Sequence, residues 1–439
     1  MKLDNPNQYK PFQKRRERLS HSLEEGIVIV PTAPERARNA DTHYDYRWDS
    51  GFYYLTGFRE PEAVLVIVLG KKARQILFCR EKNLEREIWD GFRFGPQLAR
   101  EVFGFDEALP IADLDTCIPE LLADRDVIYT PVGTDPAWDA RVSSWLNAVR
   151  AKVRTGVTAP TEIRDVRANV NDMRLFKDEE ELAVMRRAAV ISSGAHVRAM
   201  RAAAPGKREY EVEAELIHEF CRNGARAPAY GSIVATGPNA CVLHYRENTA
   251  VLKKGELMLI DAGCELDSYA SDITRTFPVG AGFSAAQKDV YELVLASQLA
   301  GIEAVKPGAD FIDYHDAATR VLVRGMIDLK LCKGSVEKVL EDGSYKQFYM
   351  HRTGHWLGLD VHDAGDYMQK GKWRKLKPGM VLTVESGCYI RPAANVPKPF
   401  WNIGVRIEDD VLVTAKGREV LTSMCPKTVK DVEAAVRGK

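Results

Sequence analysis

The sequence has no excess of charge of either sign. Its 439 residues include 62 Lys and Arg and 62 Asp and Glu, so the formal net charge is zero. A basic excess is the usual electrostatic feature of proteins that bind nucleic acid or an anionic membrane. The balance therefore gives no reason to expect nucleic acid or a membrane as a partner.

The cysteines lack any close spacing. They are Cys79, Cys117, Cys221, Cys241, Cys264, Cys332, Cys388 and Cys425. No two of them form a Cys-x-x-Cys pair, and none has the spacing of a zinc finger. Scattered cysteines in a chain of this length are typical of small buried side chains in a reducing compartment.

Long apolar runs are also lacking. The longest extends from Ala63 to Leu69 and is far too short to cross a bilayer, so it predicts a buried strand. The first residues, MKLDNPNQYKPFQKRRERL, are polar and have no apolar segment of the kind found in a signal peptide. We therefore expect a cytoplasmic protein.

A chain of 439 residues is too long for one hydrophobic core, and two domains are expected. Helix and strand signals alternate up to about residue 174. A helix is predicted over 12–23, and strands are predicted in GIVIVP, AVLVIVLG, ARQILFCR and DVIYTPVG. This pattern predicts a small α/β domain over residues 1–174, with the boundary between Arg164 and Lys177.

Residues 175–439 show long helices followed by antiparallel strand pairs, twice over. Capping pairs predict where three of the helices begin: Asp178 with Glu181, Ser284 with Gln287, and Asp310 with Asp313. Strands are predicted over Leu257–Ala262 with Ser271–Phe277, and over Val381–Ile390 with Ile403–Val413. The order of elements indicates an α+β domain built from two similar halves.

Five polar residues interrupt short apolar or turn-rich stretches of this second domain. They are Asp261, Asp272, His355, Glu385 and Glu408. Acidic side chains in such strands are costly to bury unless a cation meets them. Four carboxylates and one imidazole that converge on one point are what a pair of divalent metal ions requires.

The spacing of these residues is compatible with that convergence. Asp261 and Asp272 are eleven residues apart, which one hairpin can accommodate, with the end of one strand facing the middle of its partner. Glu385 and Glu408 repeat the arrangement on the second strand pair. Taken singly, most have a plainer explanation: an Asp can cap a turn, Glu408 can point outward, and His355 can be a core histidine. Glu385 is harder to explain in this way, because it directly follows Val-Leu-Thr-Val.

Several strings of this chain resemble aminopeptidase P, the Xaa-Pro aminopeptidase of the pita-bread metallopeptidases. In the second domain they are IDAGCELDSYASDITRTFPV, HWLGLDVHD, GMVLTVESGCYI and NIGVRIEDDVLVT. The resemblance extends to YRWDSGFYYLTGFREPEAVLVIVLG in the first domain and to MRLFKDEEELAVMRRAA at the junction. It implies a pita-bread catalytic domain preceded by a smaller α/β domain.

The resemblance also implies two divalent metal ions per chain. Asp261 and Asp272 are expected to bind one ion, with Asp272 and Glu408 bridging to a second that His355 and Glu385 complete. The oxygen-rich ligand set suits Mn²⁺, with Co²⁺ or another divalent ion as the alternative, and does not suit a structural zinc site.

By resemblance, a hydroxide that bridges the two metals attacks the carbonyl of the first residue of a peptide with proline in second position. Glu385 is the expected proton shuttle from the water to the departing nitrogen. His244 and His362 are the expected donors to the developing oxyanion. Taken alone, His244 could be a strand histidine and His362 part of a turn.

Four further residues are candidates for substrate binding. His351 is expected in the substrate pocket, and Arg406 is expected either to orient the bridging carboxylate or to line the proline pocket. By the same resemblance, Tyr367 is expected to stack on the proline ring. Trp89 is expected to close the site from the first domain or from a neighbouring subunit of a dimer or tetramer. Two of these residues have plainer alternatives: Arg406 could form a surface ion pair, and Trp89 could be a simple packing residue.

The sequence departs from the family pattern at two places beside the expected ligands. The family commonly has His-Gly where this chain has His351-Arg352, and Glu-Pro-Gly where it has Glu385-Ser386-Gly387. Neither change removes a ligand. We expect Arg352 to add a charge close to the site and Ser386 to loosen the backbone after the proton shuttle.

Two alternatives to the aminopeptidase remain open from the sequence. A Xaa-Pro dipeptidase (prolidase) shares the fold and the metals, and differs in how the site is blocked beyond the proline. A metal-free pita-bread binding module is the alternative from another functional class, and the five retained ligands argue against it. Methionine aminopeptidase lacks a large N-terminal domain, which argues against that enzyme.

Overall fold

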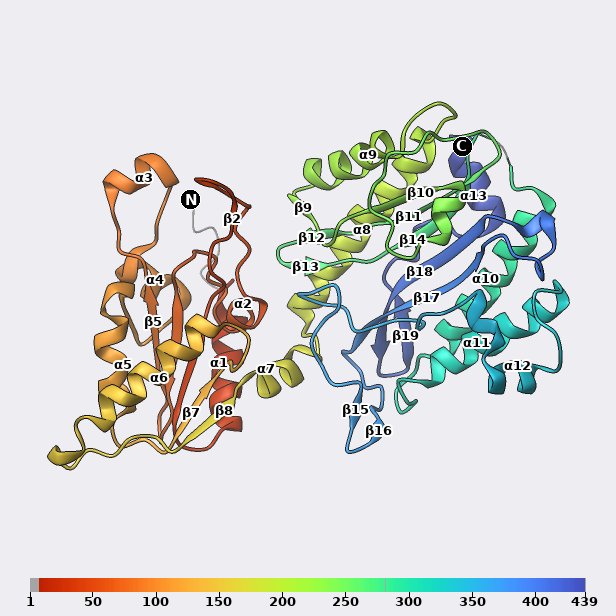
Figure 1. Ribbon diagram of the computed structural model, residues 1–439. Coiled ribbons are helices and arrows are strands. Elements are labelled where there is room, and N and C mark those ends of the chain that lie inside the picture. The colour runs from red at the N-terminus through yellow and green to blue at the C-terminus, as the bar shows by residue number, and fades with distance from the viewer. Residues whose placement is uncertain (1–7, 281, 439) are drawn as a thin grey trace. The chain divides into compact units, whose positions relative to one another are not determined.

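The chain divides into two units, Met1–Arg174 and Leu175–Lys439, shown in Figure 1. The structure is a computed structural model that describes residues 8–280 and 282–438. Over those two ranges, every helix is too short or too polar to cross a membrane.

The first unit is built on a mixed sheet of strand order β6-β5-β4-β1-β7-β8. Its strands are β1 (Ile27–Pro31), β4 (Val64–Val68), β5 (Arg74–Cys79), β6 (Glu107–Pro110), β7 (Val127–Thr130) and β8 (Glu162–Asp165), with a small separate hairpin of β2 (Ala37–Asn39) and β3 (Thr42–His43). Its helices are α1 (Lys10–Ser22), α2 (Ser50–Thr56), α3 (Leu84–Asp90), α4 (Gly95–Phe103), α5 (Leu114–Leu122), α6 (Pro136–Arg150) and α7 (Arg167–Arg174). The central strands β1 and β4 are apolar at nearly every position because both of their faces are covered.

The second unit repeats one arrangement, two helices followed by an antiparallel sheet. The first half consists of α8 (Glu179–Ala202), α9 (Glu209–Arg222) and the sheet of β10 (Ile233–Thr236), β11 (Leu257–Asp261) and β14 (Thr274–Pro278). The second half consists of α10 (Ala285–Ala304), α11 (Asp313–Asp328) and the sheet of β17 (Val381–Ile390), β18 (Ile403–Thr414) and β19 (Gly417–Val420).

The two sheets of the second unit adjoin at β14 and β18, where Thr276 Oγ1 accepts from Arg406 N at 3.2 Å and donates to Arg406 O at 3.1 Å. The helices pack against the strands and close one large apolar core (Figure 1). The remaining α-helices and strands of the second unit are α12 (Val336–Asp342), α13 (Val429–Val436) and the short strands β9 (Ala227–Pro228), β12 (Cys264–Leu266), β13 (Tyr269–Ala270), β15 (Met368–Gln369) and β16 (Lys372–Trp373).

Two of the three predicted helix starts are confirmed. Asp178 and Ser284 each form a complete capping box at the start of α8 and α10. The third prediction is wrong, because α11 begins at Asp313 with Ile312 as its N-cap. Asp310 instead forms an isolated antiparallel β-bridge with Lys375. Its backbone N–H donates to the Asp313 carboxylate at 2.8 Å, but its side chain does not cap the helix.

The first predicted strand pair is more elaborate than a simple hairpin. Strand β11 pairs with β14 and Asp261 lies opposite Thr274, but β12 and β13 form a second hairpin between them. Asp272 therefore lies just before β14, and its expected position in the middle of the partner strand is wrong. The hairpin between the strands turns the chain so that both carboxylates reach the same end of the sheet.

The second strand pair is confirmed. Strands β17 and β18 pair along their length, and Glu385 lies directly opposite Glu408. The expectation that Ser386 loosens this strand is wrong. Ser386 is fully buried, pairs with Ile407 and accepts a hydrogen bond from Ser297 Oγ at 2.9 Å, so the strand is held firmly after Glu385.

The turn that brings Asp261 and Asp272 together requires glycine at position 263. A Cβ atom built there would overlap the carbonyl oxygen of Ser271. We expect Gly263→Ala to lower the free energy of unfolding by about 1–3 kcal/mol, because backbone must move to admit the methyl group. Thermal unfolding measures the loss. The control is Gly194→Ala in α8, where the added Cβ would meet only Glu219 Oε1, at 3.8 Å. This substitution is expected to leave the free energy of unfolding unchanged or to raise it. Equal melting temperatures for the two variants would contradict this account of the turn.

Candidate metal centre and active site

Three of the five expected metal ligands form a compact cluster. Asp272, His355 and Glu408 each offer a ligand atom, and these atoms all lie within 4.8 Å of one another. They come from the segment before β14, the segment before β17, and β18 itself. Such a distance is compatible with ligation of a common ion.

The orientation of His355 suits a metal ligand. Its Nδ1 lies 2.9 Å from the carbonyl oxygen of Trp356, to which it must donate, so that Nε2 carries the lone pair in the neutral ring. Nε2 faces Asp272 Oδ2 at 3.5 Å. A backbone partner that sets the tautomer of a histidine is a common feature around metal ligands.

Asp261 completes the cluster from the end of β11. Its Oδ2 accepts from Arg406 Nη2 at 2.6 Å, and its Oδ1 accepts from the Tyr230 hydroxyl at 2.6 Å. The same hydroxyl also contacts Asp272 Oδ1. Tyr230 therefore joins the two aspartates, a role that nothing in the local sequence signals.

The second strand pair brings the two glutamates to the same place. Glu408 Oε2 accepts from Thr274 Oγ1 at 2.7 Å, which ties β18 to β14. Glu385 faces an adjoining pocket, and His351 Nδ1 lies 3.7 Å from its Oε2. The structure thus brings all five expected ligands to one end of the two sheets.

Burial and mutual repulsion dominate the electrostatics of this cluster. Burial, together with neighbouring carboxylates, raises the pKa of Asp272 and holds the pKa of Glu408 well above its usual range. Burial likewise raises the pKa of Glu385, to about 7, although His355 and Arg406 oppose the shift. Burial alone would lower the pKa of His355, but the hydrogen bond and charge of Asp272 raise it to about 9.

These donors fit divalent metal ions. Four carboxylates face one another with Arg406 and a protonated His355 as the cations in contact with them, so positive charge would relieve the repulsion. Oxygen donors with a single imidazole are the set that hard ions such as Mn²⁺ prefer.

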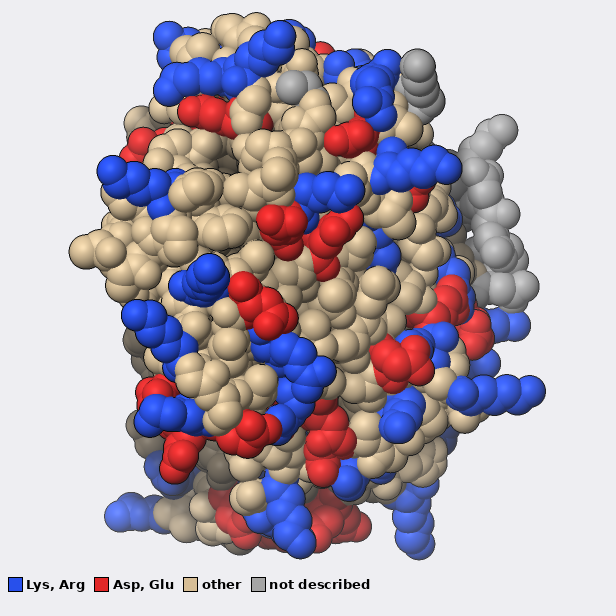
Figure 2. Space-filling view, turned by 90° about the vertical axis from the view of Figure 1, so that its right-hand side faces the viewer, with Lys and Arg blue, Asp and Glu red and all other residues tan. Residues whose placement is uncertain are grey.

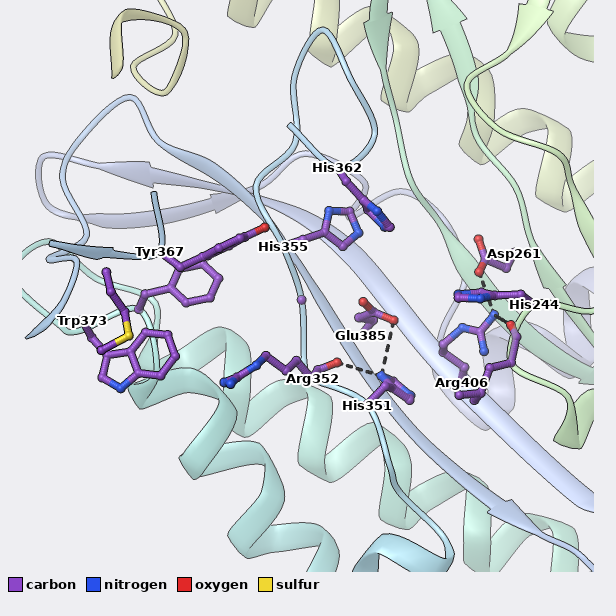
Figure 3. Close-up of a pocket in the computed structure, with 14 residues that line it drawn as sticks. His244, Asp261, His351, Arg352, His355, His362, Tyr367, Trp373, Glu385 and Arg406 are labelled. Atoms are coloured by element: carbon purple, nitrogen blue, oxygen red, sulfur yellow. Dashed lines mark hydrogen bonds and ion pairs between the residues drawn. The ribbon is translucent and has the colours of Figure 1, made fainter. Parts of the chain in front are cut away.

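A pocket of about 650 Å³ opens onto the cluster, as Figure 3 shows. It is lined by Leu243, His244, Asp261, Phe311, His351, Arg352, Gly354, His355, His362, Tyr367, Met368, Trp373, Glu385 and Arg406. Three histidines that are not expected ligands thus lie on its wall. Asp272 and Glu408 are absent from this lining and lie beneath it.

His244 and His362 are exposed on the wall of the pocket. The His362 ring packs edge-on against the His355 ring, with centroids 4.3 Å apart and planes at 69°. Burial, followed by the charge of His355, lowers the pKa of His362. Both side chains therefore face the pocket (Figure 3).

A chain of hydrogen bonds links His351 to Arg406. His351 Nδ1 lies 2.7 Å from the Arg352 carbonyl, to which it donates, and its Nε2 accepts from the Tyr389 hydroxyl at 2.8 Å. Tyr389 in turn accepts from Arg406 Nη1 at 3.0 Å. Burial lowers the pKa of His351 to about 3, so this ring is neutral. The alternative that Arg406 forms a surface ion pair is wrong, because its side chain is buried. Tyr389 is a further residue of the site, and nothing in the sequence indicated it.

An aromatic group forms the end of the pocket away from Asp261 (Figure 3). Tyr367 is stacked on Trp356, with centroids 5.7 Å apart and planes at 4°, and its hydroxyl accepts from Trp356 N at 3.4 Å. Phe311 lies 4.8 Å from the Tyr367 ring. Trp89 belongs to the other unit, on α3, where 80% of its surface is exposed, so the alternative of a simple packing tryptophan is wrong.

Two further histidines are hydrogen-bonded inside the second unit. His196 Nε2 lies 2.9 Å from the carbonyl oxygen of Ala262, next to the expected ligand Asp261. His315 Nδ1 lies 2.8 Å from Thr353 Oγ1, behind the pocket. Both side chains hold backbone near the site without facing the metal cluster.

Comparison with known proteins agrees with this geometry. Residues 183–415 match the model of metallopeptidase family M24, and residues 12–129 match the N-terminal domain of aminopeptidase P. The chain belongs to metallopeptidase family M24.

Relatives of this M24 metallopeptidase are similar over nearly their whole length. A Xaa-Pro aminopeptidase of Escherichia coli is 44% identical over 96% of both chains. The structure of the Pseudomonas aeruginosa aminopeptidase PepP matches with a TM-score of 0.96 and 49% identity over 98% of both chains. A zinc-substituted Escherichia coli aminopeptidase P in complex with product matches with a TM-score of 0.95 and 43% identity, again over 98% of both chains.

These similarities confirm the family, the fold class and the activity predicted from the sequence. The second unit has the pita-bread fold, and it follows an N-terminal domain of the aminopeptidase P type. This M24 metallopeptidase is a hydrolase of the Xaa-Pro aminopeptidase type.

The raised pKa values predict how stability depends on pH and metal. Because the pKa of Glu385 is raised to about 7, the folded state holds its proton more tightly than the unfolded state, and that stabilisation is lost as the pH rises through about 7. The raised pKa of His355, about 9, acts in the same direction above 6.5. Burial lowers the pKa of His196 and His315 to about 4 and that of His351 to about 3, which makes stability rise with pH up to about 6.5. We therefore expect the melting temperature of the metal-free protein to fall above that value, between about pH 7 and pH 9.

Added Mn²⁺ should reverse this fall, because it binds the deprotonated carboxylates. The measurement is thermal unfolding with and without Mn²⁺ across that range, with Mg²⁺ as a weaker comparison ion. The gain from Mn²⁺ should grow with pH; a gain that is the same at every pH would contradict the electrostatic account of the cluster.

Proposed function

We propose that this M24 metallopeptidase removes the first residue from peptides with proline in second position, using two divalent ions, Mn²⁺ foremost and Co²⁺ as the alternative. The observation that carries the proposal is the convergence of four carboxylates and His355 at a pocket that three further histidines line. Asp261, Asp272, His355, Glu385 and Glu408 would hold these ions, as the resemblance to aminopeptidase P implies.

Two bound divalent ions would polarise the carbonyl of the scissile bond and make a water nucleophilic near neutral pH. The residues around them have separate tasks. Arg406 holds Asp261 through Nη2 and Thr274 through Nε, and Thr274 in turn donates to Glu408. Arg406 thereby orients two of the carboxylates, one in each sheet.

Glu385 is the proposed proton shuttle. Its carboxylate faces the pocket and has a pKa raised to about 7, close to the pH at which a general acid and base works best. The amide nitrogen of proline carries no hydrogen, so it needs a proton to depart as an amine. Glu385 would take that proton from the attacking water and deliver it to this nitrogen.

The histidines and aromatic residues would hold the substrate. His244 and His362 would donate to the oxygen that develops negative charge, since both line the pocket beside the metal ligands. His351, kept neutral and oriented by Tyr389, would contact the peptide next to Glu385. Tyr367, at the aromatic end, would lie against the proline ring.

The wider setting is also part of the proposal. All eight cysteines are free thiols, which supports a cytoplasmic location. On the face shown in Figure 2, Lys and Arg side chains are interspersed with Asp and Glu and neither sign forms a continuous field, which supports peptides rather than nucleic acid as partners. We propose a dimer or tetramer, with the exposed apolar side chains of α3 at a subunit contact.

Replacement of Glu385 tests the mechanism. We expect Glu385→Gln to keep the fold and to lower kcat on a Xaa-Pro peptide by about 10²–10⁴-fold, because a neutral amide cannot carry the proton. Steady-state kinetics at saturating Mn²⁺ measure the effect, and circular dichroism checks the fold. The control is Glu341→Gln, which changes an exposed glutamate in the last turn of α12. Full activity of Glu385→Gln would exclude Glu385 as the proton shuttle.

Peptide length separates the proposed activity from its alternatives. We expect the Mn²⁺-loaded protein to cleave Xaa-Pro tripeptides and longer peptides at the Xaa-Pro bond. Cleavage restricted to Xaa-Pro dipeptides would identify a dipeptidase. A purified protein that contains no divalent ion and stays inactive after Mn²⁺ is added would identify a binding module.

The oligomer is tested at Trp89. Leu84, Ile88, Trp89 and Phe92 are all exposed on or just after α3. We expect Trp89→Ser to shift the protein to smaller species in sedimentation velocity, because it removes the largest apolar side chain of this group. Val153→Ser removes an apolar side chain that is 66% exposed elsewhere in the same unit and should leave the distribution unchanged. An unchanged distribution for the Trp89 variant would exclude Trp89 from the assembly contact.

A further inference from the structure

Arg352 is an exposed charge on the wall of the pocket that the proposed reaction leaves without a role. Its guanidinium carbon lies 5.1 Å from the centroid of the Trp373 ring. Among the residues that the structure describes, no carboxylate lies within 4.0 Å of it in an ion pair. The positive charge of Arg352 acts to lower the pKa of the Asp316 carboxyl. Burial and the charge of Asp313 outweigh this effect, so the pKa of Asp316 is raised.

Trp373 keeps this charge at the pocket. A guanidinium over an aromatic face is attracted to the ring, and its N–H groups stay free along its edge. Figure 3 shows the Arg352 side chain directed toward Trp373 and the aromatic end of the pocket. A fork of N–H donors without a carboxylate partner is the arrangement that binds a carboxylate of a ligand.

The position of Glu385 indicates which part of a substrate Arg352 faces. Glu385 must reach the departing nitrogen, so the peptide that follows the scissile bond extends to the Glu385 side of the metal cluster. His351 lies on that side, 3.7 Å from Glu385, and Arg352 follows it directly in the chain. In Figure 3, Asp261 and Arg352 lie on opposite sides of Glu385.

We propose that Arg352 binds a carboxylate in the part of the substrate that follows the scissile bond. This inference rests on the proposed function and narrows its substrate class. An extended residue spans roughly 3.5 Å, and a pocket of about 650 Å³ has room for only a few residues. The carboxylate is therefore either the free C-terminus of a short peptide or the side chain of an Asp or Glu directly after the proline.

Two pairs of peptides distinguish these sources. The first pair is Ala-Pro-Ala and its C-terminal amide, which differ only in the terminal carboxylate. The second pair is Ala-Pro-Glu amide and Ala-Pro-Gln amide, which differ only in the side chain. We expect kcat/KM to be about three- to tenfold higher for the acidic member of at least one pair, with the difference mainly in KM.

Variants assign that preference to Arg352. Arg352→Gln should bring the ratio within the preferred pair to about one, and Arg352→Lys should keep part of it because the charge remains while the fork is lost. Trp373→Leu should lower the ratio by releasing the guanidinium. Arg324→Gln removes an exposed positive charge on α11 outside the pocket lining and should keep the wild-type ratio. High salt should reduce the wild-type ratio, because an exposed ion pair is screened.

Each result decides between the proposals. Ratios of one in both pairs for the wild-type protein, or a ratio that survives Arg352→Gln, would overturn the role of Arg352 while cleavage itself still supports the aminopeptidase. Failure of the Mn²⁺-loaded protein to cleave any of the four peptides would overturn the proposed function, and the role of Arg352 with it.

Discussion

Repulsion among buried carboxylates is the constraint on which the second unit depends. Four acidic side chains meet at the ends of two sheets, where burial makes their charged forms costly. The protein offsets part of this cost with Arg406, which is itself buried and bonded to Asp261. Metal ions would offset the rest. A fold that holds these side chains together without metal stores the electrostatic free energy that metal binding then releases.

The same strands that present the ligands are anchored by ion pairs behind them. Asp409, next to the expected ligand Glu408, is buried and bonded to Arg275 at 2.7 Å and to Lys427 at 2.6 Å. These cations hold the pKa of Asp409 below its usual value despite its burial. Adjacent residues of β18 thus point in opposite directions, one toward the metal cluster and one toward a charged anchor. Alternation along a strand lets one β-strand carry crowded carboxylates on one face and the ion pairs that anchor it on the other.

Local signals in the sequence were sufficient where the structure is local. The capping pairs of α8 and α10 and the pairing of β17 with β18 follow from residues close in the chain or from regular apolar strands. The predictions failed where distant segments compete for the backbone. The β-bridge to Lys375 draws Asp310 away from α11, and β12 pairs with the distant β9, which holds the hairpin that separates Asp272 from its expected strand. Neither competitor has a signature in the local sequence.

The sequence by itself determined the chemical types of the site, because acidic side chains and a histidine interrupt apolar or turn-rich stretches in which a charge is costly to bury without a cation. It also determined the family, since the strings around those residues are specific. Tertiary structure alone decided how the ligands are oriented. It brought Tyr230 between two aspartates, set the His355 tautomer through Trp356, and turned Arg406 onto Asp261 rather than onto Glu408. These contacts join residues far apart in the chain, and their geometry depends on how two sheets pack together.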